Sequence, residues 1–440
     1  MTSSTALVQQ FESTSLSYNP VAAAQQLVAR LNLEDHYGGP QGLALTADTL
    51  SFLDIGDGQP GSGYGPVGMD NGVFTAKHSP QHLLQVFPVI ALDRWLKGYR
   101  PSLPGLAVGV LKNLGIDVSN FENDPNVTEE EKALTRALLL VSLRAEYIKG
   151  QPRGPQSWKE ANFYHNAGHV SHVAVMSHYL MDLTAHHPGV KVPRLSSQAF
   201  TRADRLAQVL DGFAHDVDHP GMNNPANDRV YRVYNERRSV DVIRPLLEAA
   251  GVSQDRICQS AARIFGTSPN EMIGGLKSAL EEINKAAPDL KKLHVIAESF
   301  PELGPLLEGT DLTVIQKRLE MAAILNDADL FGSAGCGMEA NKFLSDLLTK
   351  EVQKSGGNMN FTSDGARKYF LQNIVGARGF GSQAGTVGFN ENFYALLDAT
   401  LTNMGLAPKH AAFQAQVEKR LTPPAVSPGS GSAPAVPPGP

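Results

Sequence analysis

A short series of histidines and aspartates in this sequence has the residue types and the spacing of a metal site. His165 and His169 stand four residues apart, which places both rings on one face of a helix. Such a pair alone is weak evidence, because histidines with this spacing often lie on helix surfaces. The adjacent His215 and Asp216 strengthen it, since an imidazole and a carboxylate side by side can bind one metal, or the carboxylate can bridge two. With Asp329 as a last acidic donor, the series indicates a metal-dependent phosphohydrolase.

The last ligand must be chosen between Asp327 and Asp329. Two residues apart on a helix, their side chains point about 200° away from each other, so at most one faces the metal. Asp329 shares a face with Ala322 and Leu325, whereas Asp327 falls with the more polar Glu320. We therefore expect Asp329 to be the ligand.

The surroundings of His215 and Asp216 point to the same site. Both follow Phe213 and Ala214 and precede Val217, an apolar context in which an uncompensated ionisable pair is costly to bury. A divalent cation would remove that cost. The predicted metal ligands are therefore His169, His215, Asp216 and Asp329.

Three more polar residues lie close to this set along the chain. His165, one turn before His169, can protonate a leaving oxygen, which a metal cannot do. His219 and Asn224 follow the His-Asp pair and can hold water on a second metal or an oxygen of a substrate phosphate. His172 we expect to be an ordinary helix residue, hydrogen-bonded or solvated.

Composition and charge limit the classes of function. The chain has 440 residues, of which 42% are hydrophobic and 19% charged, enough for one large domain with an N-terminal appendage. A formal net charge of −6 argues against a broad basic surface for a nucleic acid polymer or an anionic membrane, so a substrate phosphate must be neutralised locally, by metal. The two cysteines, Cys258 and Cys336, have no metal-type spacing, and no apolar run reaches the ~18 residues of a membrane helix. We expect a cytoplasmic protein.

Helices must hold these residues in place. Thr128 and Glu131 form a capping box at the start of a helix that runs to Ile148, and helical apolar spacing recurs along the rest of the chain. We expect further helices at residues 158–183, 200–213, 240–250, 271–286, 314–330, 337–350 and 389–404. No convincing strand occurs between residues 124 and 410, so the expected fold class is all-α.

The chain divides into three expected parts. Residues 1–123 form an N-terminal extension, mixed or loop-rich, of unknown role. Residues 124–421 form a compact multi-helix catalytic domain, and residues 422–440, rich in Pro, Ser, Gly and Ala, form a disordered tail.

At these residues the chain resembles the cyclic nucleotide phosphodiesterase branch of the HD superfamily. The resemblance is carried by Tyr164-His165-Asn166-x-x-His169 and by His215-Asp216-Val217-Asp218-His219-Pro220-Gly221-x-x-Asn224. Two weaker pieces follow, Ala328-Asp329-Leu330 and Val387-Gly388-Phe389. Their order and approximate separations agree with the family over about residues 125–405.

The resemblance implies a two-metal mechanism. The four predicted ligands would hold a first metal, usually zinc, and Asp216 would bridge to a second, usually magnesium or manganese. A metal-bridging hydroxide would attack the phosphorus of a 3′,5′-cyclic nucleotide, cAMP or cGMP, and give the 5′-monophosphate. His165 would protonate the departing 3′ oxygen. A role in signal transduction follows from that substrate, and the family also allows a homodimer, for which no stretch of the sequence argues physically.

The sequence departs from the family at several supporting positions. His172 stands where the family has an aspartate, and Asn326 where it has a histidine. Thr386 aligns with the glutamine that pairs with the purine edge, although Gln383, one turn earlier, can substitute for it. Phe389 keeps the position of an apolar clamp over the substrate ring. The metal chemistry therefore looks intact, while base recognition looks altered.

Three other functions stay open. The first is an HD-type phosphohydrolase acting on a different phosphate ester, and the second is a catalytically decayed sensor that binds nucleotide without turnover. The third is a di-iron oxygenase of the same superfamily. That activity needs more histidines than His219 and His294, which are the only ones between Asp216 and Asp329.

Overall fold

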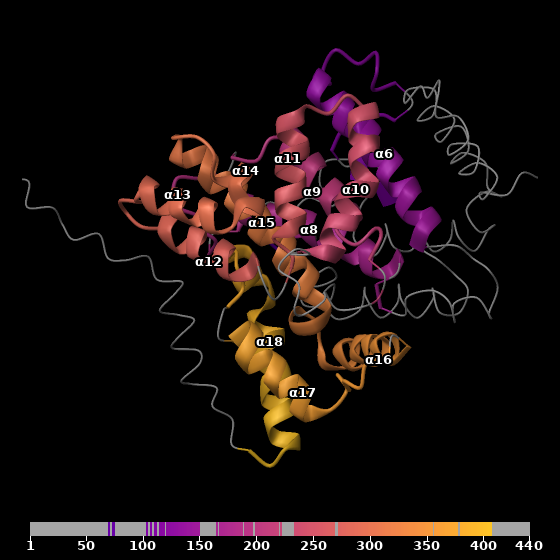
Figure 1. Cartoon of the computed structure of the whole chain (residues 1–440), viewed down its shortest axis with the longest axis vertical. Coiled ribbons are helices and arrows are strands. Elements are labelled where there is room, and N and C mark those ends of the chain that lie inside the picture. Colours follow the sequence, from indigo (N-terminus) through magenta and orange to yellow (C-terminus); the bar gives the residue numbers. More distant parts are fainter. Residues whose placement is uncertain are drawn as a thin grey trace, which may run out of the picture.

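The computed structural model describes residues 69–70, 73–74, 103–149, 164–221, 233–354 and 356–406, with short gaps inside the longer ranges. In this part of the chain nearly all regular structure is helical (Figure 1), which confirms the all-α prediction. The one strand pair within it is a short antiparallel hairpin of β1 (Met69–Asp70) and β2 (Val73–Phe74). The expectations for most of the N-terminal extension and for the C-terminal tail lie outside the described residues.

The described helices follow one another in chain order. They are α6 (Glu129–Lys149), α8 (Ala167–His186), α9 (Arg202–Ala214), α10 (Tyr234–Ala249), α11 (Gln254–Phe265), α12 (Met272–Ile283), α13 (Leu290–Ser299), α14 (Gly304–Leu307), α15 (Leu312–Leu330), α16 (Met338–Lys354), α17 (Asp364–Tyr369) and α18 (Gln383–Asn403). A π-helical turn, Phe331–Gly335, follows α15 directly, and a second one, Phe370–Gly376, follows α17.

Side-chain caps explain where several helices begin. The predicted capping box of α6 is present, with Thr128 N–H donating to Glu131 and Glu131 N–H donating to Thr128 Oγ1. The prediction placed the start of α18 too late, because Ser382 accepts a hydrogen bond from Gly385 N–H and starts the helix at Gln383. The start of α10 was also placed too late. It has no side-chain cap, so its sequence gives no signal there.

The centre of the molecule is built on α8. Every residue from His169 to Leu183 is buried, as expected for a helix that is apolar nearly all round. Helix α9 crosses it very closely at Gly212, where an added Cβ would lie 2.5 Å from the Cα of Ala174. Because only glycine permits this approach, the sequence fixes how near the ends of α8 and α9 come to each other.

Helix α15 lies between two apolar clusters. Met321, Leu325 and Ala328 belong to the main cluster with α6, α8 and α9, and Leu319 and Ala323 belong to a second cluster with α12 and α13. Burial on both sides fixes the axial rotation of α15, and with it the directions in which its aspartates point.

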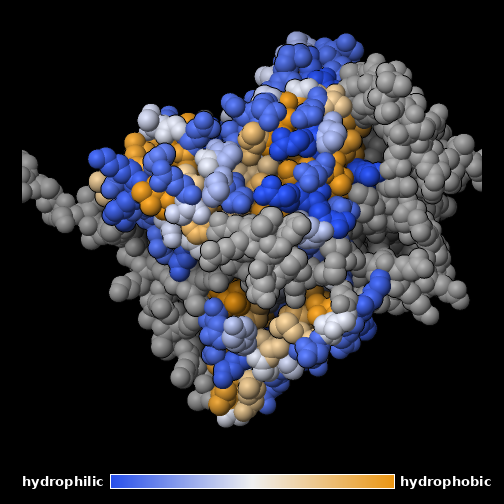
Figure 2. Space-filling model, viewed as in Figure 1, coloured by the Kyte–Doolittle hydropathy of each residue, from blue (hydrophilic) through white to orange (hydrophobic). Residues whose placement is uncertain are grey.

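The main cluster already includes residues before the predicted domain start at 124. Leu103, Val110 and Phe121 are buried in it. The domain division therefore stays a prediction, but packing reaches further toward the N-terminus than residue 124. The face shown in Figure 2 has hydrophilic and hydrophobic residues interspersed. Among the described helices, none combines the length and the apolar character needed to cross a membrane.

Candidate metal centre

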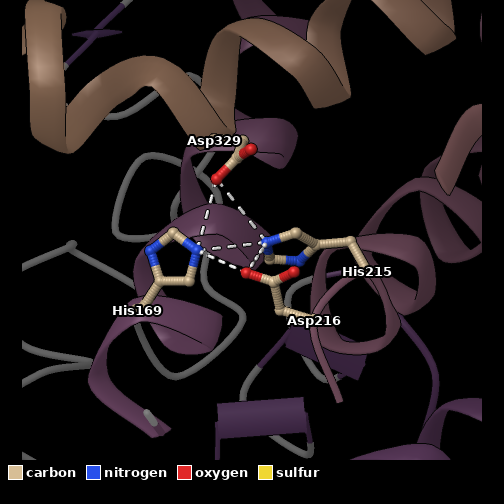
Figure 3. A group of neighbouring side chains, drawn as sticks. All are labelled: His169, His215, Asp216 and Asp329. Carbon is tan, nitrogen blue, oxygen red and sulfur yellow. Dashed lines mark hydrogen bonds and ion pairs between the residues drawn. The ribbon is translucent and has the colours of Figure 1, made fainter. Parts of the chain in front are cut away.

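Three helices bring the four predicted ligands together (Figure 3). His169 lies in the first turn of α8, His215 and Asp216 directly follow α9, and Asp329 lies in the last turn of α15. One ligand atom from each residue falls within 4.8 Å of all the others. The structure thus converts a sequence pattern spread over three helices into one compact donor set.

The separations between these atoms suit a single cation. The Nε2 atom of His169 lies 3.1 Å from Asp216 Oδ2, 3.2 Å from Asp329 Oδ1 and 3.2 Å from the Nε2 atom of His215. His215 Nε2 lies 3.3 Å from Asp216 Oδ2 and 3.7 Å from Asp329 Oδ1. Donors at about 2.0–2.2 Å from a tetrahedral zinc stand about 3.3–3.6 Å apart. Two nitrogens and two oxygens at these distances therefore fit a zinc-type site.

The Nδ1 atoms of His169 and His215, which point away from the donor set, each contact another polar group. His215 Nδ1 donates to the carbonyl oxygen of Gly212 at 2.9 Å, so Nε2 is the atom that faces the donor set and that offers a lone pair when the ring is neutral. His169 Nδ1 lies 3.2 Å from Nε2 of His172. Such outer contacts orient ligating histidines and set their basicity.

The electrostatics keep the carboxylates ionised. Burial alone would raise the pKa of Asp216, but the charges of His215, His219 and His165 hold it well below its usual range. The pKa of Asp329 is likewise lowered, because hydrogen bonds and charges from His169 and His215 outweigh burial. Burial lowers the pKa of His215, but Asp216 and Asp329 outweigh this effect and raise the pKa to about 10. Ionised carboxylates are the form that binds metal.

His165 lies beside this set, not within it. Its Nε2 is 3.8 Å from Asp216 Oδ2, and its Nδ1 is hydrogen-bonded to Glu351, which also accepts from the backbone N–H groups of Tyr164 and His165 at 2.7 and 3.0 Å. The ring of His219 stacks on that of His165 with centroids 3.9 Å apart. His165, His219 and Glu351 thus form a second polar cluster next to the donors.

Glu351 is the residue that sequence reasoning missed. It lies on α16 and is 2% exposed in the structure, directly beneath His165. Burial alone would raise the pKa of Glu351. The charge and hydrogen bonds of His165 outweigh this effect and lower the pKa to about 2. A signal was present, since Leu344 and Leu347 share its helix face and are buried. A carboxylate on an apolar face needs a partner.

Asp327 has a structural task that explains why it is not in the donor set. Its carboxylate accepts hydrogen bonds from Gly381 N–H at 2.8 Å and from the N–H and hydroxyl of Ser382, both at 2.7 Å. It therefore caps the N-terminus of α18. The choice of Asp329 over Asp327 agrees with this geometry, although Asp327 and Glu320 are buried and do not lie on a solvated face.

A cavity of about 280 Å³ lies between α12, the end of α15 and the start of α18. Asn326 and Leu330, which flank Asp329 along the chain, form part of its wall. Of the residues predicted to contact substrate, Gln383 and Thr386 line it. Asn390, one turn after Thr386, adds a carboxamide to the same wall.

The polar groups of the two predicted residues are engaged with backbone. Gln383 Oε1 accepts from Lys191 N–H at 2.7 Å, and Thr386 Oγ1 donates to the carbonyl of Ser382 at 3.0 Å. Phe389 is a correction to the sequence prediction. It is fully buried between Phe331 and Phe380 and does not line the cavity, because its helix face turns into the core. Asn224 lies outside the described residues.

The family comparison decides the kind of protein. Residues 164–239 match the family model described as 3'5'-cyclic nucleotide phosphodiesterase. The match contains three of the four donors, namely His169, His215 and Asp216. It also contains His165 and His219.

Residues 164–239 carry the signature of the cyclic nucleotide phosphodiesterase family. The family match and the donor set together give this chain the activity of a metal-dependent phosphodiesterase. No curated protein has a matching sequence.

Solved structures similar to this phosphodiesterase are distant from it. The phosphodiesterase domain of the RhoPDE fusion protein from the choanoflagellate Salpingoeca rosetta is 17% identical, with a TM-score of 0.43, covering 72% of this chain and 92% of that one. LmjPDEB1 in complex with IBMX is 13% identical, with a TM-score of 0.38, covering 81% and 97%. At such scores the fold assignment rests on the helices described above.

Proposed function

We propose that this phosphodiesterase hydrolyses a 3′,5′-cyclic nucleotide to the 5′-monophosphate. The convergence of His169, His215, Asp216 and Asp329 carries the proposal, since four donor atoms that could hold a first metal lie beside a histidine that can act as an acid. The donor types favour zinc there, and Asp216, whose Oδ2 lies 3.8 Å from Nε2 of His165, would be shared with a second ion, magnesium or manganese.

Divalent ions held there would supply a hydroxide nucleophile at neutral pH and neutralise charge on the phosphate. The remaining work falls to side chains. His165, positioned by Glu351 through its Nδ1, would present a proton on Nε2 to the departing 3′ oxygen. The Glu351 carboxylate stabilises the positive charge that this ring carries before transfer. His219, stacked on His165, and Asn224 would hold water or phosphate oxygens.

The cavity that Asn326 and Leu330 help to line would take the base. Leu276, Leu330 and Phe393 offer apolar surface for a ring, and Gln383, Thr386 and Asn390 offer polar groups from α18. This wall lacks a glutamine at the position of Thr386, so a preference for adenine or guanine is left to the experiment below.

A different phosphate ester is the second candidate substrate. The observation that favours it is the engagement of Gln383 Oε1 and Thr386 Oγ1 with backbone partners, which reduces the polar groups left to read a purine edge. A sensor that binds nucleotide without turnover is the remaining alternative.

Cys258 and Cys336 are free thiols, which supports a reducing cytoplasmic location.

The test compares wild type with Asp216→Asn and a matched control, Asp218→Asn. Asp218 is two residues away and pairs with Arg238 at 2.9 Å outside the donor set. Each protein, supplied with Mn²⁺ or Mg²⁺, is assayed against cAMP, cGMP and a base-free diester. Cleavage of a cyclic nucleotide that is lost only in Asp216→Asn supports the proposal. Cleavage of the base-free ester alone favours the second candidate, and nucleotide binding without product favours the sensor.

A further inference from the structure

His172 lies behind His169, on the side away from the other metal donors. Both rings are completely buried, and they meet edge to face with His169 Nδ1 3.2 Å from His172 Nε2. The sequence pattern alone indicated an ordinary helix position. The structure instead places His172 in direct contact with a predicted metal ligand.

The direction of this hydrogen bond follows from the donor set. For His169 Nε2 to offer a lone pair to a metal, the ring must carry its proton on Nδ1 and donate it to His172 Nε2. His172 then carries its own proton on Nδ1. That atom is buried and has no hydrogen-bond partner in the described part of the chain.

The surroundings of His172 keep its ring neutral. Its ring is completely buried, and the ring of Phe331 lies across it with centroids 5.7 Å apart, an apolar setting that disfavours a charged imidazole. His172 therefore accepts the proton of His169 without contributing negative charge. A carboxylate in this position would increase the electron donation of His169 to a metal.

Charge balance shows what the neutral partner does. Asp216 and Asp329 together carry two negative charges, which neutralise one divalent ion. A third carboxylate behind His169 would give the loaded site a net negative charge and tighten it. We propose that His172 is a positioning residue that orients His169 while keeping the first metal weakly held, so that the ion exchanges with the medium. This inference rests on the proposed metal site.

A matched pair of variants tests it. His172→Glu and His172→Gln have nearly the same shape, and both reach as far as the ring nitrogen, but only the first brings a charge. Zn²⁺ and Mn²⁺ affinities are measured by competition with a chelator, and thermal unfolding reports whether each variant is folded. We expect His172→Glu to bind metal about 10–100-fold more tightly than His172→Gln, with wild type close to His172→Gln.

Equal affinities in the two folded variants, or a wild type as tight as His172→Glu, would overturn the proposal. If neither variant folds, nitrogen-15 NMR of the wild type decides the matter. The zinc-loaded protein must show His172 protonated on Nδ1 alone, and a proton on Nε2 contradicts the inference. If wild type and Asp216→Asn bind equally little metal, the metal site itself is refuted, and the role of His172 with it.

Discussion

The Nε2 atoms of His169 and His215 lie 3.2 Å apart although the two residues belong to different helices. This proximity depends on the close crossing of α8 and α9 at Gly212, whose carbonyl oxygen also accepts the Nδ1 proton of His215. The packing of two helices and the orientation of a ligand thus rest on one residue without a side chain.

Gly212→Ala is expected to destabilise the protein by about 1–3 kcal/mol or more, because its Cβ would meet backbone atoms of Ala174. Metal affinity should fall with it, since α9 must move away from α8. Gly274→Ala is the control, because that glycine is helical and has open space around it. It should leave stability unchanged or raise it by up to about 1 kcal/mol. Chemical unfolding and metal titration report both effects, and equal behaviour of the two variants would contradict the packing argument.

Asp329→Asn should reduce metal binding strongly while the fold persists. The side chain is the most exposed of the four donors, at 26%, and its loss leaves no buried cavity in the core. Removing one protein ligand from the first site should cost at least about 10-fold in affinity, and hydrolysis should fall in parallel. Metal content after dialysis is the measurement. A variant that retains full metal content would assign the last position to another residue.

His165→Gln and Glu351→Gln separate acid catalysis from binding. With a poor leaving group such as a sugar hydroxyl, His165→Gln should reduce kcat by about 10²–10⁴-fold. Glu351→Gln should cause a smaller loss, because it removes the charge behind the acid but not the acid.

A p-nitrophenyl ester is the control substrate for these variants, since its leaving group needs no proton. If His165 is the acid, its loss should matter little for that ester. Equal losses on both esters would mean that the histidine binds substrate or metal and does not donate the proton.

Glu320 should make stability depend on pH in an unusual direction. Burial and the nearby charge of Asp327 raise its pKa from 4.5 to about 8 against the hydrogen bond from Gln383 N–H. Between these values the folded protein keeps a proton that the unfolded chain has lost, so the free energy of unfolding falls as pH rises, with the full loss above pH 8. Glu320→Gln should remove a pH-dependent loss on the order of 5 kcal/mol. Urea unfolding at acidic and mildly alkaline pH measures it, and identical pH slopes in both proteins would contradict the shift.

Asn390→Ala tests the cavity as a base site. A carboxamide can pair with the edge of adenine that carries N6 and N7, an interaction of about 1–3 kcal/mol, so its loss should raise KM for a cyclic nucleotide by about 5- to 150-fold. The base-free diester should be cleaved as well as before. An unchanged KM for cAMP and cGMP would remove Asn390 from the base site.

The convergence of the four predicted donors could be foreseen because their signal is local. His169, His215 and Asp216 stand in short motifs, and Asp329 was separated from Asp327 by helical geometry. The all-α fold was predictable from apolar periodicity. Glu351 was not found, because it lies 186 residues from His165 and its partner becomes visible only when α16 packs beneath that histidine. The burial of Phe389 escaped prediction because its exposure depends on Phe331 and Phe380, which come from other segments.

The last turns of α15 connect the predicted metal donors with the start of α18, which forms part of the cavity wall. Asp329 points to the metal donors, while Asp327 holds Gly381 and Ser382 at the entrance to α18. A substitution near residues 381–386 that widens or reshapes the cavity would pull on Asp327 and, through one rigid helical turn, on Asp329. Variants selected for a new substrate at this wall should therefore also change in the metal concentration they require. Substrate preference and metal demand in this chain would evolve together.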